Sequence, residues 1–367
     1  MDTMGVKLDG IITRRKILLK DLKGSIIAVD APNIIYGLLN FSHKNPSFNE
    51  TNLILDRTQR VISHLYGIVY RIKFYYSKAI LPIFCFDGRV SPLKREITKN
   101  QLNDFRYTKR RYTKAIKNGN KTLARKIALS HEYLWPNVMH ESKALLGALG
   151  IPTIESPASA ESQCAELVKQ GVVDYSNSQD YDSLLFGCPL LLQNLSKSRR
   201  RKVRGRWTYQ RVDPLVSDLD TNLEPLGITQ FQLVDLALML KTDYFDGILG
   251  IGPKTALKFI KEYVTIEEVM KEERMNFDFS DLSPELIKKF RKLFLLPEVI
   301  ESYDNIYWDP PNKQRVLELL CRDHHLDLER VGNNTDKLSE YFFETLQYFK
   351  YQRNHSKSIQ KTLDMVL

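Results

Sequence analysis

The stretch Ser178-Gln179-Asp180-Tyr181-Asp182-Ser183-Leu184-Leu185-Phe186-Gly187 places two carboxylates two residues apart. The apolar run Gly171-Val172-Val173 precedes this stretch, and Leu184-Leu185-Phe186 follow its two carboxylates. This pattern predicts a buried strand that leads into an acidic turn. Carboxylates at the end of a buried strand are costly unless a partner neutralises them, and a hard divalent cation does so with oxygen ligands. A solvated turn that contains Asp by chance explains this stretch alone equally well.

Two further apolar runs also end in Asp. Residues 25–30 end at Asp30, and residues 80–88 reach Asp87 just before their last glycine. Such continuous apolar runs are typical of buried strands in a parallel sheet. In open α/β sheets the ligand crevice lies outside the carboxyl ends of the strands, so we expect Asp30, Asp87, Asp180 and Asp182 to lie together.

Composition describes an ordinary soluble globular chain, with 367 residues, 43% hydrophobic and 27% charged. No apolar run approaches the length of a membrane span, and the first residues lack the apolar core of a signal peptide. The four cysteines are scattered in apolar contexts without paired spacing, which predicts reduced core residues of an intracellular protein. The length suggests about two domains.

Basic residues are concentrated in one part of the chain. Lys and Arg total 54 against 44 Asp and Glu, and residues 94–126 alone hold twelve basic and two acidic residues, an excess equal to the net charge of +10. A second basic cluster occupies residues 197–206. This distribution favours a polyanionic partner. Outside these two basic clusters the chain is net acidic.

Helical periodicity predicts helices over residues 33–41, 58–77, 92–135, 137–149, 159–171 and 233–240, and over most of 257–353. Ser159 is a natural N-cap, with Glu161 in the first turn of its helix. Thr229-Gln230-Phe231-Gln232 resembles a capping box. Asp243 then ends the helix that this box opens.

The basic stretch 92–135 interleaves Phe105, Tyr107 and Tyr112 with its cations, and we expect it to bury an apolar face poorly by itself. A solvated helix pair is one interpretation. Its place directly after Asp87 favours a phosphate-tracking element instead. The segment 250–256 predicts a tight glycine turn whose backbone N–H groups can hold a phosphate, although a plain connection between helices has the same pattern.

The chain resembles the flap endonucleases, structure-specific 5′ nucleases of DNA replication and repair, and is most similar to their archaeal members. The resemblance covers nearly the whole length and rests on Met4-Gly5-Val6, Val29-Asp30-Ala31, Ser63-His64-Leu65, Phe86-Asp87-Gly88, the stretch 178–187, Thr242-Asp243-Tyr244 and Gly250-Ile251-Gly252-Pro253-Lys254.

This resemblance implies an α/β fold in which helices flank a mostly parallel central sheet, with a helical arch and a helix-hairpin-helix DNA-binding region. It implies a single nuclease domain over 4–353, with an N-terminal part 4–110, an arch at about 92–135, an internal part 137–265, the helix-hairpin-helix at about 233–262 and a helical part 266–353. A mobile tail follows over 354–367.

The resemblance also implies the site. One Mg²⁺ ion is expected at Asp30, Asp87 and Glu161, and a second at Asp180, Asp182 and Asp243, with Mn²⁺ as an alternative ion. Two metals clamp the attacking and leaving oxygens of an in-line displacement. Lys94 matches an arch lysine near the scissile phosphate and, with Asp180 and Asp182, completes the expected catalytic residues.

For DNA binding the resemblance implies Tyr36, which matches a base-stacking tyrosine but is nearly as well explained as a core residue. The other expected contacts are Arg71, Lys94, Arg95, Lys99, Gly250, Gly252 and Lys254. The 250–254 hairpin is expected to hold the downstream duplex, often with a K⁺ ion. The substrate is flapped or nicked double-stranded DNA.

The chain departs from the family at the active site. The family has Pro-Ser-Glu-Gly-Glu-Ala-Gln in the segment that matches 157–163, whereas Ser159 replaces the first glutamate here. A hydroxyl in place of a carboxylate should weaken metal binding. The arch arginine has no clean match and falls on Asn100 or Gln101, for which Arg95 or Lys99 could substitute.

Both chain ends depart as well. Met1-Asp2-Thr3 precedes the Met4-Gly5 start of the family, so Met4 is the true start or the extension crowds the substrate. The tail 360–367 resembles a clamp-binding motif with Gln360 and Leu363 at the right spacing, but Val366 and Leu367 replace the aromatic pair. We expect weak binding to the sliding clamp.

The expected state is a monomer, located in the cytoplasm if the source is archaeal and in the nucleus if it is eukaryotic.

The leading hypothesis is a Mg²⁺-dependent 5′ flap endonuclease, slower than typical members, with 5′ exonuclease activity as an accompanying option. The alternative is a catalytically weakened or inactive structure-specific DNA-binding protein of the same fold, for which Ser159 and the missing arch arginine argue. A relative that acts on RNA or on free ends also stays open. A phosphatase explains neither the arch nor the hairpin.

Overall fold

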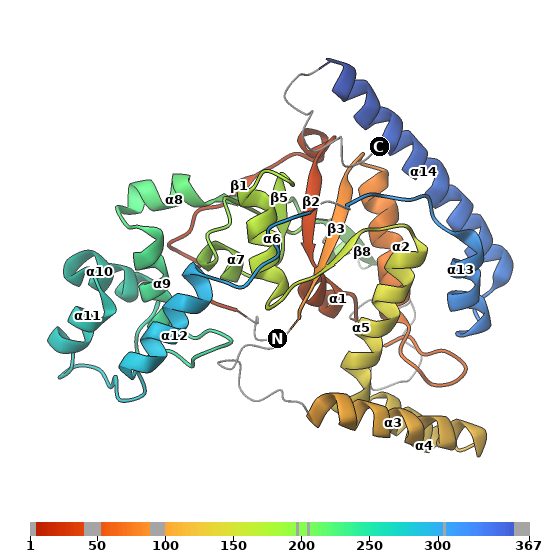
Figure 1. The fold of residues 1–367 in the computed structure, drawn as a ribbon, viewed down its shortest axis with the longest axis horizontal. Coiled ribbons are helices and arrows are strands. Elements are labelled where there is room, and N and C mark those ends of the chain that lie inside the picture. The colour runs from red at the N-terminus through yellow and green to blue at the C-terminus, as the bar shows by residue number, and fades with distance from the viewer. Residues whose placement is uncertain are drawn as a thin grey trace. The chain divides into compact units, whose positions relative to one another are not determined.

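The computed structural model describes residues 5–39, 53–88, 100–195, 198–203, 206–303 and 306–355 (Figure 1). The chain forms two compact units. The first consists of Met1–Asp30, Cys85–Glu96 and Glu155–Ser302, and the second consists of Ala31–Phe84, Ile97–Ile154 and Tyr303–Leu367.

The first unit contains a sheet with a parallel centre. Its strands follow the order β1 (Arg15–Lys16), β9 (Leu215–Asp218), β6 (Leu190–Gln193), β5 (Tyr175–Asn177) and β2 (Ile26–Asp30). β2, β5 and β6 run parallel, and β9 and β1 add antiparallel strands. All of β2 is buried, and helix α6 (Ala160–Lys169) packs against β2 and β5. The expected α/β class with a mostly parallel sheet is confirmed.

The strand predicted before Asp180 is shorter and starts later than expected. Val172 and Val173 both donate backbone hydrogen bonds to the Leu167 carbonyl, so they form the turn that ends α6 and not a strand. The strand is β5, and the apolar run after Asp182 is a helical turn, α7 (Asp182–Leu185). Gly171 makes the difference, because its φ of +69° reverses the chain at the helix end.

The remaining helices of the first unit are α8 (Leu219–Leu226), α9 (Gln230–Leu238), α10 (Pro253–Tyr263), α11 (Ile266–Glu272) and α12 (Pro284–Leu295), with a short 3₁₀ turn, η1 (Leu19–Leu22). The Thr229–Gln232 capping box is present, so α9 starts three residues earlier than predicted. Asp235 of α9 is fully buried and accepts two hydrogen bonds of 2.7 Å from Arg291 of α12. Arg291 also contacts Glu267 of α11, so one guanidinium joins three helices.

The second basic cluster lies on a strand pair that periodicity did not predict. β7 (Ser198–Val203) and β8 (Arg206–Arg211) form a two-stranded antiparallel sheet, with Arg200 opposite Tyr209 and Lys202 opposite Trp207. Four of the six residues of β7 are cationic, a composition that carries little strand signal.

The second unit is mainly helical. It contains α1 (Ala31–Leu39), α2 (Ser63–Tyr76), α3 (Asn100–Lys117), α4 (Lys121–Ala128), α5 (His131–Ala148), α13 (Lys313–Leu317), the π-helical turn η2 (Glu318–Arg322) and α14 (Leu328–His355). Strands β3 (Leu81–Phe86) and β4 (Thr153–Glu155) are the segments in which the chain passes from this unit to the first.

Several predicted helix starts in this unit are wrong, among them that of α1, which begins at Ala31 and not at residue 33. The helix expected from residue 58 begins at Ser63, because the Asp56 carboxylate accepts the backbone N–H groups of Thr58 and Arg60 and holds a turn there. The helix expected from residue 137 begins at His131. The long basic helix is divided at Gly119, and Asn120 caps α4 by accepting the Leu123 N–H.

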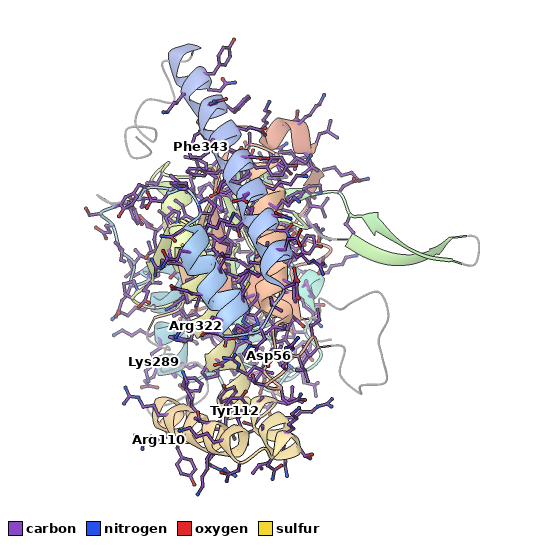
Figure 2. The ribbon with its side chains drawn as sticks, turned by 90° about the vertical axis from the view of Figure 1, so that its right-hand side faces the viewer. Asp56, Arg110, Tyr112, Lys289, Arg322 and Phe343 are labelled. Atoms are coloured by element: carbon purple, nitrogen blue, oxygen red, sulfur yellow. The ribbon has the colours of Figure 1, made fainter. Side chains whose placement is uncertain are left out.

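The basic helices bury more apolar surface than expected. Tyr112 and Ala115 of α3 pack with Ile127 of α4 and Tyr133 of α5 in a small core. The rings of Tyr112 and Tyr133 are 5.0 Å apart. In Figure 2, Tyr112 lies on the side of α3 nearer Asp56, while Arg110 lies farther out on the same helix pair. The helix pair thus has an apolar inner side and a cationic outer side.

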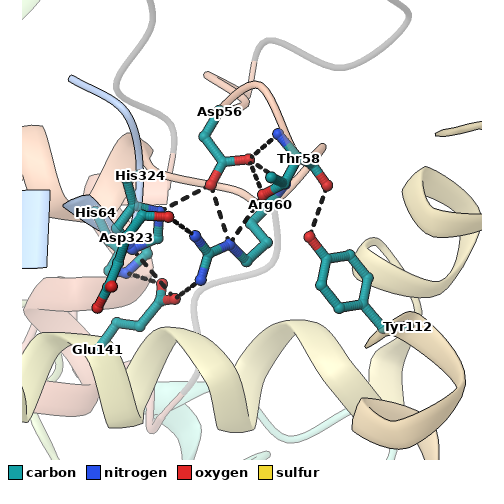
Figure 3. A network of polar contacts seen from close by, with 8 residues as sticks. All are labelled: Asp56, Thr58, Arg60, His64, Tyr112, Glu141, Asp323 and His324. Carbon is teal, nitrogen blue, oxygen red and sulfur yellow. Dashed lines mark hydrogen bonds and ion pairs between the residues drawn. The ribbon is translucent and has the colours of Figure 1, made fainter. Parts of the chain in front are cut away.

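A buried ionic network joins the loop before α2 to α5 and to the segment after η2 (Figure 3). The Arg60 Nε donates to Asp56 at 3.0 Å, and its Nη1 lies 3.5 Å from Glu141. The two ring nitrogens of His324 lie 2.9 Å from Asp56 and 3.3 Å from Glu141. His64 Nε2 also lies 3.3 Å from Glu141.

The pKa values of this network follow from burial and pairing. Burial lowers the pKa of His64 below its ordinary value, and Glu141 only partly opposes that shift. Burial also tends to lower the pKa of His324, but its hydrogen bonds to Asp56 and Glu141 outweigh burial and raise the pKa. Burial alone would raise the pKa of Asp56 and Glu141, yet their hydrogen bonds, above all to His324, lower both. His324 and Arg60 thus both contact the two carboxylates, and of these two partners His324 is the one that titrates near neutral pH.

Three of the four cysteines, Cys85, Cys164 and Cys188, are buried as expected, whereas Cys321 is partly exposed. In the part of the chain that the structure describes, no helix is long and apolar enough to cross a membrane.

Candidate active site

The carboxyl ends of β2 and β5 bring the first carboxylates together. Asp30 is the last residue of β2 and is only 3% exposed. The Ser178 hydroxyl, just beyond β5, donates to Asp30 Oδ2 at 2.9 Å and accepts the Asp180 N–H at 3.3 Å. Since β2 and β5 are parallel neighbours, this contact holds at one sheet edge the two residues that the strand ends predicted to meet.

The N-terminal segment organises the second group of carboxylates. The Gly5 N–H donates to Asp243 Oδ1 at 3.0 Å, and the Val6 N–H donates to Asp182 Oδ1 at 2.6 Å. A Cβ at Gly5 would lie 3.0 Å from Asp180 Cβ and 3.1 Å from Asp182 Oδ1. Asp180, Asp182 and Asp243 therefore converge on one glycine, whose φ of +96° suits no larger residue.

The third group lies at the start of α6. The Ala160 N–H donates to Asp87 Oδ1 at 2.8 Å, which places Asp87 beside Glu161 in the first turn of that helix. The Gly88 N–H donates to the Ala158 carbonyl, and a Cβ at Gly88 would lie only 1.7 Å from the Ser156 carbonyl oxygen. The backbone thus fixes Asp87 at the helix N-terminus, where a negative charge is favoured.

Ser159 acts as the N-cap of α6. Its hydroxyl accepts the Ser162 N–H at 3.1 Å, as its place before the helix predicted. The side chain that replaces a family glutamate is therefore engaged with the helix backbone.

Tyr244 shows how close the carboxylates lie to one another. This tyrosine is buried, and burial raises its pKa well above the ordinary value. The negative charges of Glu161, Asp182, Asp243 and Asp87 raise the pKa further, in that order. A group that feels four carboxylates at once sits beside a site of concentrated negative charge, and a cation relieves such repulsion.

The donor set fits hard divalent ions, because every candidate ligand is a carboxylate oxygen. Among the described residues, however, no three His, Cys, Asp or Glu side chains stand at ligand spacing around one point. The structure thus brings Asp30, Asp87, Glu161, Asp180, Asp182 and Asp243 into one region of the first unit.

The predicted glycine hairpin forms in the first unit. Gly250 has a φ of +88°, Gly252 is the N-cap of α10 and Pro253 occupies its first turn. The first turn of a helix has N–H groups without partners inside the helix, which suits a phosphate. Lys254 is exposed in that turn, and Leu249 before it is 97% exposed.

The structure describes only some of the remaining DNA-binding candidates. In the second unit Tyr36 is 47% exposed on α1, which favours a surface role over a core role. Arg71 is half-buried on α2 and hydrogen-bonds Tyr75. Several candidates lie outside the described residues or their described side chains: Lys94, Arg95, Lys99, Asn100, Gln101, Gln360, Leu363, Val366 and Leu367.

Several residues that shape the site were not singled out by their chemistry in the sequence. Gly5, Gly88 and Tyr244 entered only inside quoted motifs, and Ser178 only as the start of the acidic stretch. The signal for Ser178 was its place one residue after a buried strand, beside two aspartates. No local sequence pattern predicts the hydrogen bond between Gly5 and Asp243.

Family models and relatives agree with this geometry. The XPG N-terminal domain matches residues 4–107, and the XPG I-region matches residues 150–243. Flap endonuclease 1 of Methanosarcina acetivorans is 34% identical over 336 residues, covering 91% of this chain and 96% of the relative. Flap endonuclease 1 of Aeropyrum pernix is 35% identical over 348 residues, covering 94% and 97%.

This chain belongs to the flap endonuclease family. Among solved structures, flap endonuclease-1 from Methanococcus jannaschii matches with a TM-score of 0.70 and 27% identity, over 93% of this chain and 99% of that one. The catalytic core of Rad2 in complex with DNA substrate matches with a TM-score of 0.60 and 23% identity, over 89% and 95%, and shows the shared fold. The expected structure-specific 5′ flap nuclease is confirmed, and the alternative of a binding protein without catalysis is not favoured.

Proposed function

We propose that this flap endonuclease hydrolyses DNA phosphodiesters near flap junctions with two Mg²⁺ ions held by its carboxylates. Asp30, Asp87 and Glu161 would hold one ion. Asp180, Asp182 and Asp243 would hold the other. The observation that carries the proposal is the convergence of Asp180, Asp182 and Asp243 on the backbone of Gly5 and Val6, with Asp180 tied to Asp30 through Ser178.

The chain's own groups orient the ligands. The Gly5 N–H fixes one oxygen of Asp243, and the Val6 N–H fixes one oxygen of Asp182. The Ser178 hydroxyl orients Asp30 in the same way. When bound, a pair of ions supplies Lewis-acid catalysis and stabilises charge on the attacking and leaving oxygens. Such supporting hydrogen bonds typically change metal affinity or activity by about 10- to 100-fold.

For substrate binding, we propose that the exposed cations of α3 contact the phosphates of a single-stranded 5′ flap, and that Lys94 approaches the scissile phosphate. Arg95 and Lys99 would take the place of the missing arch arginine. The first turn of α10 would bind a phosphate of the downstream duplex through its N–H groups and Lys254, with K⁺ as an added ligand. Tyr36 would stack on a base and Arg71 would contact the backbone.

The finer assignments are part of the same proposal. They comprise 5′ exonuclease activity at nicks, Mn²⁺ as a substitute ion, a monomer, and weak clamp binding through the 360–367 tail. We also propose that residues 4–353 form a single nuclease domain. The archaeal source of the reported relatives favours the cytoplasm.

The direct test replaces Asp180 with Ala. Because Asp180 would be a metal ligand but not a DNA anchor, cleavage of a 5′-labelled flap should fall by at least about 1,000-fold while flap affinity changes little. The control is Asp246→Ala, since Asp246 is an exposed carboxylate three residues after Asp243. Cleavage at the parent rate by Asp180→Ala would show that Asp180 is not a required metal ligand, and it would contradict the proposed ligand set.

A further inference from the structure

Tyr36 has an aromatic neighbour that the family motifs do not include. The ring of Trp135 on α5 lies 6.0 Å from the ring of Tyr36 on α1, with an angle of 69° between the ring planes. This edge-to-face arrangement is a favourable one for two aromatic rings. It also fixes the two rings as one unit within the second compact unit of the chain.

The pair is placed at the surface. On α1, Ile34, Ile35 and Leu38 are buried, whereas Tyr36 and Gly37 are exposed. Among the described residues, a Cβ at Gly37 would meet no atom within 4 Å apart from its chain neighbours. Trp135 is partly exposed, in contrast to Trp308, which is 5% exposed and donates its indole N–H to the Pro82 carbonyl.

The polar atoms of the pair are available as well. Within the described parts of the chain, neither the Tyr36 hydroxyl nor the Trp135 indole N–H has a hydrogen-bond partner. Buried Tyr and Trp side chains normally satisfy these groups, so their availability here agrees with a wet or ligand-facing position.

The same helix connects the pair to the cationic helices. Two residues before Trp135, Tyr133 packs on Tyr112 and Phe105 of α3 at ring distances of 5.0 Å and 5.8 Å. The outer side of α3 exposes Arg106, Lys109, Arg110, Lys114 and Lys117. Trp135 of α5, paired with Tyr36 of α1, thus lies on a helix that packs against α3, whose outer side exposes a row of cations. Proteins hold single-stranded nucleic acid with this combination of aromatic rings and cations.

We propose that Trp135 is a second base-stacking residue, which together with Tyr36 forms a two-ring platform for unpaired bases of the 5′ strand. This inference rests on the proposed function, because it adds base stacking to the phosphate contacts proposed for the exposed cations of α3. Stacking is tolerant of sequence, so the platform would favour an unpaired strand over a duplex end without selecting particular bases.

Intrinsic fluorescence tests the platform directly. In a Trp207→Phe background only Trp135 and the buried Trp308 remain, so emission from the exposed tryptophan reports on Trp135. We expect DNA with a 5′ flap of thymidines, added with EDTA to prevent cleavage, to quench this emission. The same duplex without the flap should quench it much less, and abasic sites through the flap should abolish the difference.

Substitution supplies the second readout. Trp135→Leu should weaken binding of the flapped DNA by about 5- to 100-fold and leave binding of the unflapped duplex unchanged, whereas Trp135→Phe, which keeps a ring, should retain most of the affinity. Urea unfolding of both variants shows whether the fold is retained.

Two outcomes would overturn the proposal. One is a Trp135 emission that does not respond to the flap, and the other is equal flap affinity in Trp135→Leu and the parent. Parent cleavage of the flapped DNA in Mg²⁺, measured in parallel, separates these outcomes from a failure of the nuclease function itself.

Discussion

Gly5 shows how much of the active site depends on a residue without a side chain. Its N–H binds Asp243, while the space that a Cβ would need is taken by Asp180 and Asp182. Any side chain there must push the carboxylates apart or change the backbone from its φ of +96°. The N-terminal segment is therefore part of the site and not merely near it.

Gly5→Ala should reduce the cleavage rate by about 10- to 100-fold with a small change in flap affinity, because it displaces the proposed metal ligands and no proposed DNA contact. Strain at this φ should also lower the free energy of unfolding by about 1–3 kcal/mol. Gly147→Ala is the matched control, since a Cβ there meets no atom within 4 Å. Single-turnover rates and titration with flapped DNA measure the two effects, and an unchanged rate in Gly5→Ala would contradict them.

Ser159 offers a second test at the same scale. The hydroxyl caps α6 and lies two residues before Glu161, where the family has a further glutamate. Ser159→Glu restores a carboxylate at a helix N-terminus, so the Mg²⁺ concentration for half-maximal rate should fall several-fold. Ser159→Gln, similar in size but neutral, should not show this fall. If the two variants have the same metal dependence, position 159 does not face an ion.

At the residue scale the sequence predicted that carboxylates at strand ends lie together, and the Ser178 hydroxyl does join Asp30 to the Asp180 backbone. The apolar runs before Asp30 and Asp87 are strands, whereas the run before Asp180 is the turn that ends α6. The roles of Gly5 and Tyr244 were not predicted, since what matters for them is contact with residues far away in the chain, and no local periodicity records such contact.

Among the elements, the loop before α2, helix α5 and the segment after η2 are joined by the Asp56–Arg60–Glu141–His324 network. All four side chains are largely shielded from solvent. Removing one partner of a buried ion pair typically costs about 3–5 kcal/mol because the other charge stays behind. The network therefore fixes these three segments at the cost of sensitivity to pH.

The sign of that sensitivity follows from each group. Asp56 and Glu141 have lowered pKa values, so their contribution to stability is present above their ordinary values and is lost as the pH falls through their folded values. His324 has a raised pKa, so its contribution is present below its ordinary value of 6.5 and is lost as the pH rises through its folded value. His64, with a lowered pKa, disfavours folding below pH 6.5.

His324→Gln should accordingly lower the free energy of unfolding by about 3 kcal/mol at pH 6 and by less at higher pH. The decline of stability above pH 6.5 that His324 causes in the parent should disappear. His140→Gln, which changes an exposed histidine on α5, should leave the pH profile intact. Denaturant titrations from pH 5 to 9 measure both, and parallel profiles for the parent and His324→Gln would contradict the raised pKa of His324 in this network.

Element boundaries were less predictable than element types. The sequence placed α2 five residues too early, because the Asp56 turn that excludes the helix relies on one side chain binding two backbone N–H groups. The β7–β8 pair was missed because cations conceal strand periodicity. The apolar inner side of α3 and α4 was underestimated, since two of its members, Tyr112 and Tyr133, are separated in sequence and meet only through folding.

For the whole molecule, negative and positive charge are unevenly distributed along the chain. The excess of basic residues falls in 94–126, and six carboxylates gather in the first unit. Without an ion these carboxylates repel one another and weaken the fold, a cost that proteins accept where a metal or substrate later offsets it.

Mg²⁺ should therefore stabilise the chain against unfolding. At 100 times the dissociation constant the gain would be about 2.7 kcal/mol per ion, and EDTA should reverse it. Asp180→Asn should be at least as stable as the parent in EDTA but gain less from Mg²⁺. Thermal unfolding at constant ionic strength, with Na⁺ replacing the removed charge, separates this effect from screening. An equal response to Mg²⁺ in the parent and Asp180→Asn would contradict the proposed ligand set.

The most direct test of the account is the position of the cut in a double-flap DNA labelled at its 5′ flap end. With Mg²⁺, the purified chain should make one incision near the flap junction, and EDTA should abolish it. Mn²⁺ should support the same incision. Firm binding of the flapped DNA without any incision in Mg²⁺ or Mn²⁺ would contradict the proposal that these six carboxylates form a working two-metal nuclease site.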